Sequence, residues 1–181
     1  MKKEIADRIT ELGGTFSFQG QSLQNDIESI KFNKTYLMTE FEDYLQDELY
    51  AKIKQMGVIP EAEITYPRIE FQHNLFTPFT EGTDDYAEWN DSLDEEAVRS
   101  VVGSNELQFM YIGESAGYPN YYFICLSDLN KDNPTVYTTD HEAFFDEVEV
   151  MGTLEDYFNL FVSEEEYRAT MENFVEELRS E

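Results

Sequence analysis

The sequence predicts an α+β fold, with a mixed or mostly antiparallel sheet flanked by helices at both termini. Two observations lead to this prediction. Apolar residues recur at helical spacing near both ends of the chain, and short runs rich in aromatic and β-branched residues cluster between residues 107 and 138. The 181 residues are 41% hydrophobic, which suffices for one packed core. We therefore expect a single domain over 1–181, in which residues 1–35 are open to being an N-terminal appendage.

The N-terminal third is predicted to hold two helices. The first covers 2–12, where the apolar residues lie on one helical face before a pair of glycines. Residues 15–32 match no single period and stay unassigned. The second helix covers 36–56, which has seven apolar residues at helical spacing. Residues 63–71 look extended, and Pro67 restricts them to an edge strand or to two short strands.

A long loop and a further helix are expected next. Residues 73–92 contain a proline, a glycine and paired acidic residues, a composition typical of a loop. Ser92 and Glu95 have the spacing of a capping box, in which a hydroxyl and a carboxylate satisfy free amides at the start of a helix. This helix should end near Val102, with Gly103 as its C-cap.

The centre of the chain contains the clearest strands. Residues 107–112 and 121–126 are rich in aromatic and branched side chains, and the eight residues between them include two glycines and a proline. This pattern predicts a β-hairpin. Both strands are apolar on both faces, so the sheet should be covered on both sides. A third strand is predicted over 135–138, and 147–150 offers a short fourth run.

Two more helices are predicted at the C-terminal end. Thr153 opens the first, and Ser163 opens the second with a glutamate at capping-box spacing. Apolar residues at helical spacing follow both positions. These helices complete the expected arrangement of a central sheet between terminal helices.

The charge of the chain excludes several classes of partner. The net charge is −27, and residues 91–181 hold four basic against 22 acidic residues. Such a surface repels nucleic-acid phosphates and anionic lipid headgroups, so we expect neither nucleic acid nor membrane as a partner. A single cysteine cannot form an internal disulfide, and the sequence has no apolar leader and no membrane-length apolar segment. A cytoplasmic location is therefore expected.

The excess of acidic residues has two interpretations. It can serve solubility alone, because net charge keeps a protein dispersed. It can also serve recognition, because an acidic surface speeds the encounter with a cationic protein and fixes its orientation.

Motifs for metal binding and catalysis are incomplete in this sequence. Residues 128–133 begin like a calcium loop but have Asn133 where such loops need glycine, so a polar turn is expected. His141 and Glu142 lack the second histidine of a zinc-protease motif, because residue 145 is phenylalanine. Cys125 lies within an apolar run and is expected to be buried and structural. We expect no catalytic residue, no metal and no cofactor.

Residues 107–161 contain a series of short elements in a recognisable order. They are a strand ending in Ile-Gly, a turn with a glycine, a strand leading to an aspartate, a strand with Pro, Val and Tyr, a polar loop and an amphipathic helix. The residues that form them are Ile112-Gly113, Gly117, YYFICL up to Asp128, Pro134, Val136 and Tyr137, Asp140-His141-Glu142, and TLEDYFNLF. In this order the chain resembles the C-terminal half of the SUKH superfamily, which includes yeast cell-wall regulators and bacterial immunity proteins.

The resemblance implies an α+β fold with a mixed or antiparallel sheet flanked by helices, and no catalytic residues. It also implies a bacterial role in binding and neutralising a partner toxin, often a nuclease. Because nucleases commonly carry basic clefts, this role would give the negative charge a purpose.

We therefore expect a non-enzymatic cytoplasmic binding protein of the immunity type, whose acidic surface meets a cationic, nuclease-type toxin. Loop carboxylates and loop aromatic residues are the expected contacts. The candidates are Asp84, Asp85, Trp89, Asp91, Glu114, Tyr118, Asp128 and Asp132. Two alternatives stay open: a regulatory or scaffold protein that binds a host partner, and an enzyme that uses paired carboxylates with a divalent metal.

Overall fold

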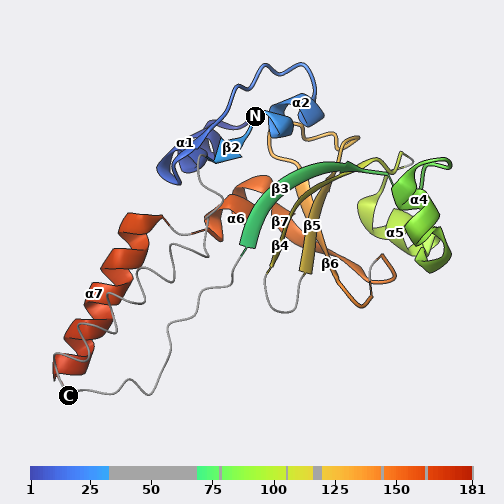
Figure 1. Cartoon of the computed structure of the whole chain (residues 1–181). Helices are drawn as coiled ribbons and strands as arrows, with labels where there is room; N and C mark the ends of the chain where they lie inside the picture. The colour runs from blue at the N-terminus through green and yellow to red at the C-terminus, as the bar shows by residue number, and fades with distance from the viewer. Residues whose placement is uncertain are drawn as a thin grey trace.

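The computed structural model has an α+β architecture built on a five-stranded antiparallel sheet (Figure 1). The structure describes residues 1–32, 69–77, 79–104, 106–115, 120–143, 145–161 and 163–180. The strands lie side by side in chain order, as β3 (Ile69–Phe76), β4 (Phe109–Ser115), β5 (Asn120–Cys125), β6 (Thr135–Asp140) and β7 (Val148–Thr153). The predicted fold class, the hairpin and the two strands that follow it are confirmed.

Helices lie at both termini, as predicted. The elements outside the large sheet are α1 (Lys3–Glu11), β1 (Gly14–Thr15), α2 (Leu23–Glu28), β2 (Lys31–Phe32), α4 (Asp84–Trp89), the 3₁₀ turn η1 (Asn90–Ser92), α5 (Glu95–Val102), α6 (Leu154–Asn159) and α7 (Glu164–Ser180). β1 and β2 pair with each other. The helix predicted over 36–56, and the part of the extended segment before residue 69, lie outside the described residues.

Each face of the large sheet has its own apolar cluster, because successive side chains of a strand point to opposite faces. On one face lies the first core cluster, formed with α1, α2 and α6: Ile5, Ile9, Leu23, Ile27, Ile30, Ile69, Met110, Ile112, Tyr122, Ile124, Val136, Leu154, Tyr157, Phe158 and Phe161. On the other lies the second core cluster, formed with α5: Val98, Leu107, Phe109, Phe123, Cys125, Tyr137 and Phe145. The prediction that the sheet is covered on both sides is confirmed.

The N-terminal region contributes directly to the first core cluster. α1 buries Ile5 and Ile9, and α2 buries Leu23 and Ile27. The stretch over 15–32, which the sequence left unassigned, forms the end of β1, then α2 and β2. Residues 1–32 are thus integrated into the packing of the sheet.

A bulge in β4 leaves one carbonyl out of the sheet ladder, and a buried tyrosine satisfies it. The register of β4 against β5 shifts between Tyr111 and Gly113, so Ile112 has no cross-strand partner. The Tyr157 hydroxyl in α6 donates to the Ile112 carbonyl oxygen at 2.9 Å. Burial raises the pKa of Tyr157 well above its ordinary value, so the hydroxyl keeps its proton and remains a donor. The bond fastens α6 to the first face of the sheet.

The loop predicted over 73–92 is wrong. Its first residues continue β3, because Asn74, Leu75 and Phe76 pair with β4. Its later residues form α4, whose first amides are capped by the Thr83 hydroxyl, which accepts from the Tyr86 amide at 3.3 Å. Pairing with a distant strand and a local cap together override the loop-like composition.

The start predicted for the next helix is also wrong, by two residues. Asp94 is the N-cap of α5, and its carboxylate accepts from the Ala97 amide at 2.9 Å. Ser92 belongs to η1 instead. The predicted end is confirmed, because Gly103 closes α5 with a φ of 67°.

The two C-terminal capping predictions are confirmed. The Thr153 hydroxyl accepts from the Asp156 amide at 3.3 Å, and the Asp156 carboxylate accepts from the Thr153 amide at 2.8 Å. Ser163 and Glu166 exchange the same pair of bonds at 3.2 and 2.7 Å. α6 and α7 therefore each begin with both halves of a capping box.

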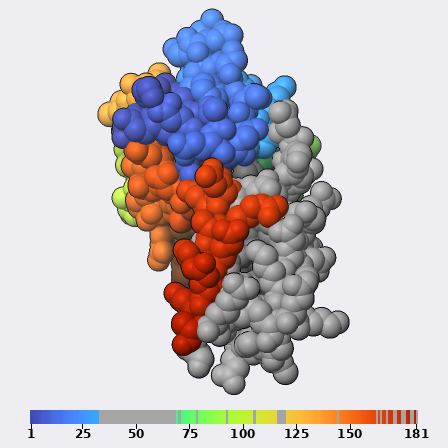
Figure 2. All heavy atoms as spheres, turned by 90° about the vertical axis from the view of Figure 1, so that its left-hand side faces the viewer, coloured from blue at the N-terminus to red at the C-terminus, as the bar shows by residue number. Residues whose placement is uncertain are grey.

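Arg8 joins α1 to the beginning of α7. Figure 2 shows α1, α6 and α7 on one side of the molecule, in blue, orange and red. The guanidinium of Arg8 is bidentate, with Nη1 and Nη2 each 3.0 Å from an oxygen of Glu166, and it also donates to the Phe161 carbonyl. This hydrogen bonding lowers the pKa of Glu166 to about 2 against the opposing effect of burial.

The Arg8–Glu166 pair should make stability depend on acidic pH. A carboxyl whose pKa is lower in the folded than in the unfolded state stabilises the fold. The contribution is complete at a pH above the unfolded-state pKa, here 4.5, and is lost as the pH falls through the folded-state pKa of about 2. Because the Glu166 side chain is 47% exposed, solvent screening limits the effect to about 0.5–1 kcal/mol. We expect urea unfolding to show a free energy of unfolding lower in the Glu166→Gln variant than in the wild type by this amount at pH 7, and by much less at pH 2.5. The control is Glu165→Gln, at an exposed residue of the same helix, which should leave the free energy of unfolding at pH 7 nearly unchanged.

Candidate protein-binding surface

Acidic residues greatly outnumber basic ones from β3 onward and in the segment that follows it. Over residues 69–163 the sequence has two basic residues, Arg99 and Lys131, against 20 acidic ones. Residues 81–104, here called the acidic lobe, hold eight of these acidic residues and only Arg99 as a base. The lobe comprises α4, η1, α5 and the turns beside them, and Figure 1 shows α4 and α5 together at the right-hand end of the sheet.

Asp85 attaches the lobe to the sheet. Its carboxylate accepts hydrogen bonds from the backbone amide and the hydroxyl of Thr77, directly after β3. Burial opposes ionisation of this carboxyl, but hydrogen bonds from Thr83 and Thr77 outweigh that effect and lower the pKa of Asp85. Asp85 therefore stays charged and acts as a structural anchor for α4.

α4 lies on the surface without joining either core cluster. None of its six residues is buried, and it is held by the Thr83 cap and the Asp85 anchor. Tyr86 and Trp89, the only tryptophan of the chain, are half-buried on this helix. The prediction that these two aromatic residues lie in a loop is therefore wrong. Their helix leaves aromatic surface next to exposed carboxylates.

α5 fixes the other half of the lobe. Val98 is buried in the second core cluster, so the helix lies against the sheet. Arg99 pairs with Glu95 one turn earlier, with Nε 2.8 Å from the carboxylate. The one base of the lobe is thus matched to a glutamate of the lobe itself, and the carboxylates of Asp84, Glu88 and Asp91 remain exposed.

The eight predicted contact residues do not come together at one place. Asp84, Asp85, Trp89 and Asp91 lie together on α4 and η1. Glu114 lies at the other end of the sheet, because the end of β4 pairs with the start of β3 while the lobe follows the end of β3. There the Glu114 carboxylate accepts from the Tyr111 hydroxyl at 2.8 Å. Tyr118 lies outside the described residues.

Asp128 and Asp132 lie in the connection between β5 and β6. Asp128 accepts from the amides of Asn130 and Thr135 at 2.7 and 2.8 Å, so it shapes the loop, and the predicted polar turn is confirmed. Asp132 accepts from the N-terminal ammonium of Met1 at 3.1 Å. Both carboxylates already have structural partners, and Met1 packs against the first core cluster, on the face of the sheet away from α5.

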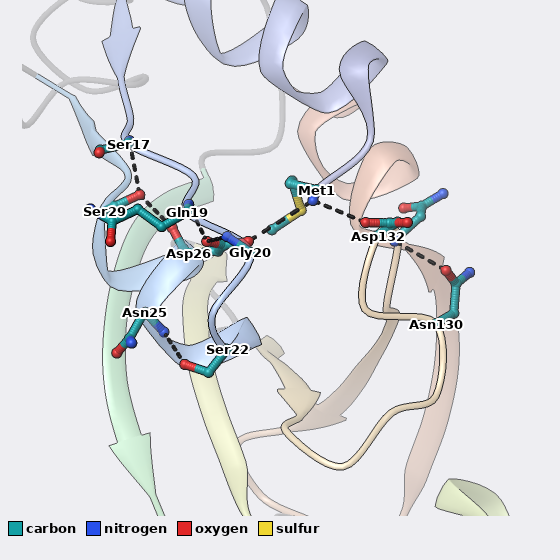
Figure 3. A network of polar contacts seen from close by, with 11 residues as sticks. Met1, Ser17, Gln19, Gly20, Ser22, Asn25, Asp26, Ser29, Asn130 and Asp132 are labelled. Atoms are coloured by element: carbon teal, nitrogen blue, oxygen red, sulfur yellow. Dashed lines mark hydrogen bonds and ion pairs between the residues drawn. The ribbon is translucent and has the colours of Figure 1, made fainter.

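A buried aspartate that the sequence analysis missed lies in this same region (Figure 3). Asp26 of α2 is 3% exposed. Its Oδ1 accepts from the amides of Gln19 and Gly20 at 2.9 and 3.1 Å, and its Oδ2 lies 3.9 Å from the Met1 ammonium. The network joins α1, α2 and the loop of Asp132 and has a structural role. Nothing in the sequence distinguishes Asp26 from the other acidic residues.

The sequence also singled out Cys125 and motifs for binding a metal ion. Cys125 is buried in the second core cluster, as predicted, and its Sγ is 3.4 Å from the Glu106 carbonyl. No group of three or more histidine, cysteine or acidic side chains suited to a metal ion occurs among the described residues. Of the helices that the structure describes, none combines the length and apolar character needed to cross a bilayer.

Comparison of the chain with family models, with curated proteins and with solved structures finds no match. What the protein does must therefore be inferred from its own residues.

Proposed function

We propose that this chain is a non-enzymatic binding protein whose acidic lobe docks onto a cationic protein. In the light of the SUKH resemblance, the partner is a nuclease-type bacterial toxin and the chain is its immunity protein. The observation that carries the proposal is the composition of the lobe: the exposed carboxylates of Asp84, Glu88 and Asp91 share α4 and the turn after it with the half-buried Trp89, and none of the residues of α4 is fully buried.

The lobe combines the two features that protein recognition uses most. Tryptophan and tyrosine are enriched among the residues that contribute most of the binding energy. Exposed carboxylates such as Asp84, Glu88 and Asp91 would surround such anchors and steer a positively charged partner into place. In this proposal Trp89 supplies affinity and the carboxylates supply speed and orientation.

The proposed mechanism is occlusion. A nuclease must bind a polyanionic backbone, so its active cleft carries lysine and arginine side chains. The acidic lobe offers carboxylates to the same cationic side chains and would compete with nucleic acid for the cleft. Inhibition then needs no chemistry by the immunity protein, only a complex that is more stable than the toxin's complex with nucleic acid.

The charge contribution is tested with a triple variant, Asp84→Asn/Glu88→Gln/Asp91→Asn. The probe is the basic nuclease expected from the adjacent gene, with its inhibition and association rate measured at about 50 and about 300 mM salt. We expect stoichiometric inhibition by the wild type and an association rate about tenfold lower in the triple variant at low salt. The matched control, Glu165→Gln/Glu172→Gln/Glu176→Gln on α7, removes the same charge elsewhere and should bind almost normally.

Trp89→Ala should instead raise the dissociation rate, by about 30-fold if Trp89 is an energetic anchor. Because Trp89 is half-buried, urea unfolding of the variant accompanies the binding measurement, and the dissociation rate is compared under conditions in which both proteins are folded. Binding that is insensitive to salt would contradict the proposal, as would equal effects of the two triple variants. The absence of a basic toxin gene next to this one would favour the regulatory or scaffold role.

A further inference from the structure

We propose that the outer edge of β7 receives an extended segment of the partner, rich in lysine or arginine, as a sixth strand of the sheet. This inference rests on the proposed function and specifies how part of the partner is held.

β7 is the last strand in the order of the large sheet. Among the described residues its only strand neighbour is β6, with which it pairs antiparallel; the register shifts at Met151, so the regular part of the edge is Val148–Val150. A strand in this position directs alternate amides and carbonyls away from the sheet, where an added strand can pair with them.

The edge also exposes an apolar side chain. Val150 is 57% exposed, although it lies opposite Tyr137, which is buried in the second core cluster. Residues directly opposite one another share a face, so Val150 extends the second face of the sheet beyond its covered part. Every second side chain of an added strand would lie on this same face, and an apolar one could pack beside Val150.

The negative charge near β7 favours a positively charged segment at this edge. Asp146, Glu147 and Glu149 are exposed at or just before β7, and the sequence has no basic residue between Lys131 and Arg168. α5 of the acidic lobe contacts β7, so the edge continues the negatively charged surface of the lobe.

A second copy of this chain is disfavoured as the occupant of the edge. It would bring its own Glu149 and the acidic residues just before β7 close to those already there, and like charges on paired strands are destabilising. Charged residues on edge strands commonly prevent self-association in this way. A segment with alternating lysine and apolar residues escapes the repulsion and gains ion pairs. The opposite edge strand, β3, also has a single acidic residue, but Arg68 precedes it in the sequence, whereas Asp146 and Glu147 precede β7, so β3 lacks this selectivity.

The test uses a capped ten-residue peptide of alternating lysine and valine, with the intact chain labelled for NMR hydrogen exchange. A control peptide of equal charge has prolines in place of three valines, so it cannot pair as a strand. We expect saturating lysine–valine peptide to slow exchange of alternate β7 amides about tenfold or more, and the proline peptide to leave them unchanged. Glu149→Lys should weaken peptide binding about fivefold or more, whereas the matched Glu172→Lys on α7 should not.

Protection confined to the acidic lobe, or equal protection by both peptides, would overturn the edge proposal. Failure of the lysine–valine peptide to bind would also overturn it. None of these three results bears on the docking of the lobe, which is judged separately by inhibition of the nuclease. If the wild-type chain did not inhibit the nuclease, the proposed function would be wrong, whether or not the peptide binds at β7.

Discussion

Replacing Asp26 by alanine should lower the free energy of unfolding by about 3 kcal/mol, because the change leaves the two backbone amides that this buried carboxylate binds without their acceptor. The Asp26 carboxylate is almost completely buried and accepts from the amides of Gln19 and Gly20 while facing the Met1 ammonium. Alanine removes both hydrogen bonds and the nearby negative charge in one step. The measurement is urea unfolding at pH 7.

Asp132 provides the matched control for this variant. It contacts the same ammonium at 3.1 Å, but its side chain is 82% exposed. Asp132→Asn should therefore cost no more than about 0.5 kcal/mol, since exposed ion pairs contribute little. If the two variants were equally stable, burial of Asp26 would not be the cause of its importance. Asp26→Asn should lie between them, because the amide oxygen can still accept from the two backbone groups.

Phe145→Ala is expected to cost about 4 kcal/mol, the range measured for large apolar side chains removed from a core. The ring is buried at the centre of the second core cluster, 5.2 Å from the Phe123 ring and 5.5 Å from the Phe109 and Phe76 rings between centroids. Its removal would leave a cavity that the sheet cannot close, because β4 and β5 are paired on both sides. Thermal and urea unfolding measure the loss.

The effect of Phe145→Ala should extend to the acidic lobe. Phe79, just before the lobe, packs edge-on against the Phe145 ring at 6.1 Å. Leu129→Ala is the control, because that side chain is fully exposed and should be nearly silent. A loss below about 1 kcal/mol for Phe145→Ala would mean that the second face is not packed as described.

Local patterns in the sequence predict most of the described fold. The hairpin, the third strand and the terminal helices are each encoded by neighbouring residues, through side-chain period, turn composition and caps such as Thr153 and Ser163. The sequence pattern fails where distant pairing decides the outcome. Nothing local in 73–76 indicates a strand, and only the register with β4 reveals it. Thr83 followed by two aspartates is a helix-start signal that the nearby proline and glycine obscure.

The candidate surface was predictable in part, for a topological reason. Asp84, Asp85, Trp89 and Asp91 are neighbours in sequence, so one short helix and its turn keep them together. Glu114 precedes β5 and Asp128 follows it, and residues on either side of one strand must lie at opposite ends of the sheet. The buried role of Asp26 depends on contacts with distant residues and has no local signal.

The position of the single tryptophan has a practical consequence for solution work. Intrinsic emission excited at the red edge of protein absorbance comes from the indole of Trp89 alone, on a helix that contributes to neither hydrophobic cluster. The chain thus has a built-in optical reporter for local opening and ligand titration at α4. The far-ultraviolet dichroism signal follows the secondary structure of the whole chain. If Trp89 emission and far-ultraviolet dichroism changed at different denaturant concentrations, α4 would unfold independently of the sheet.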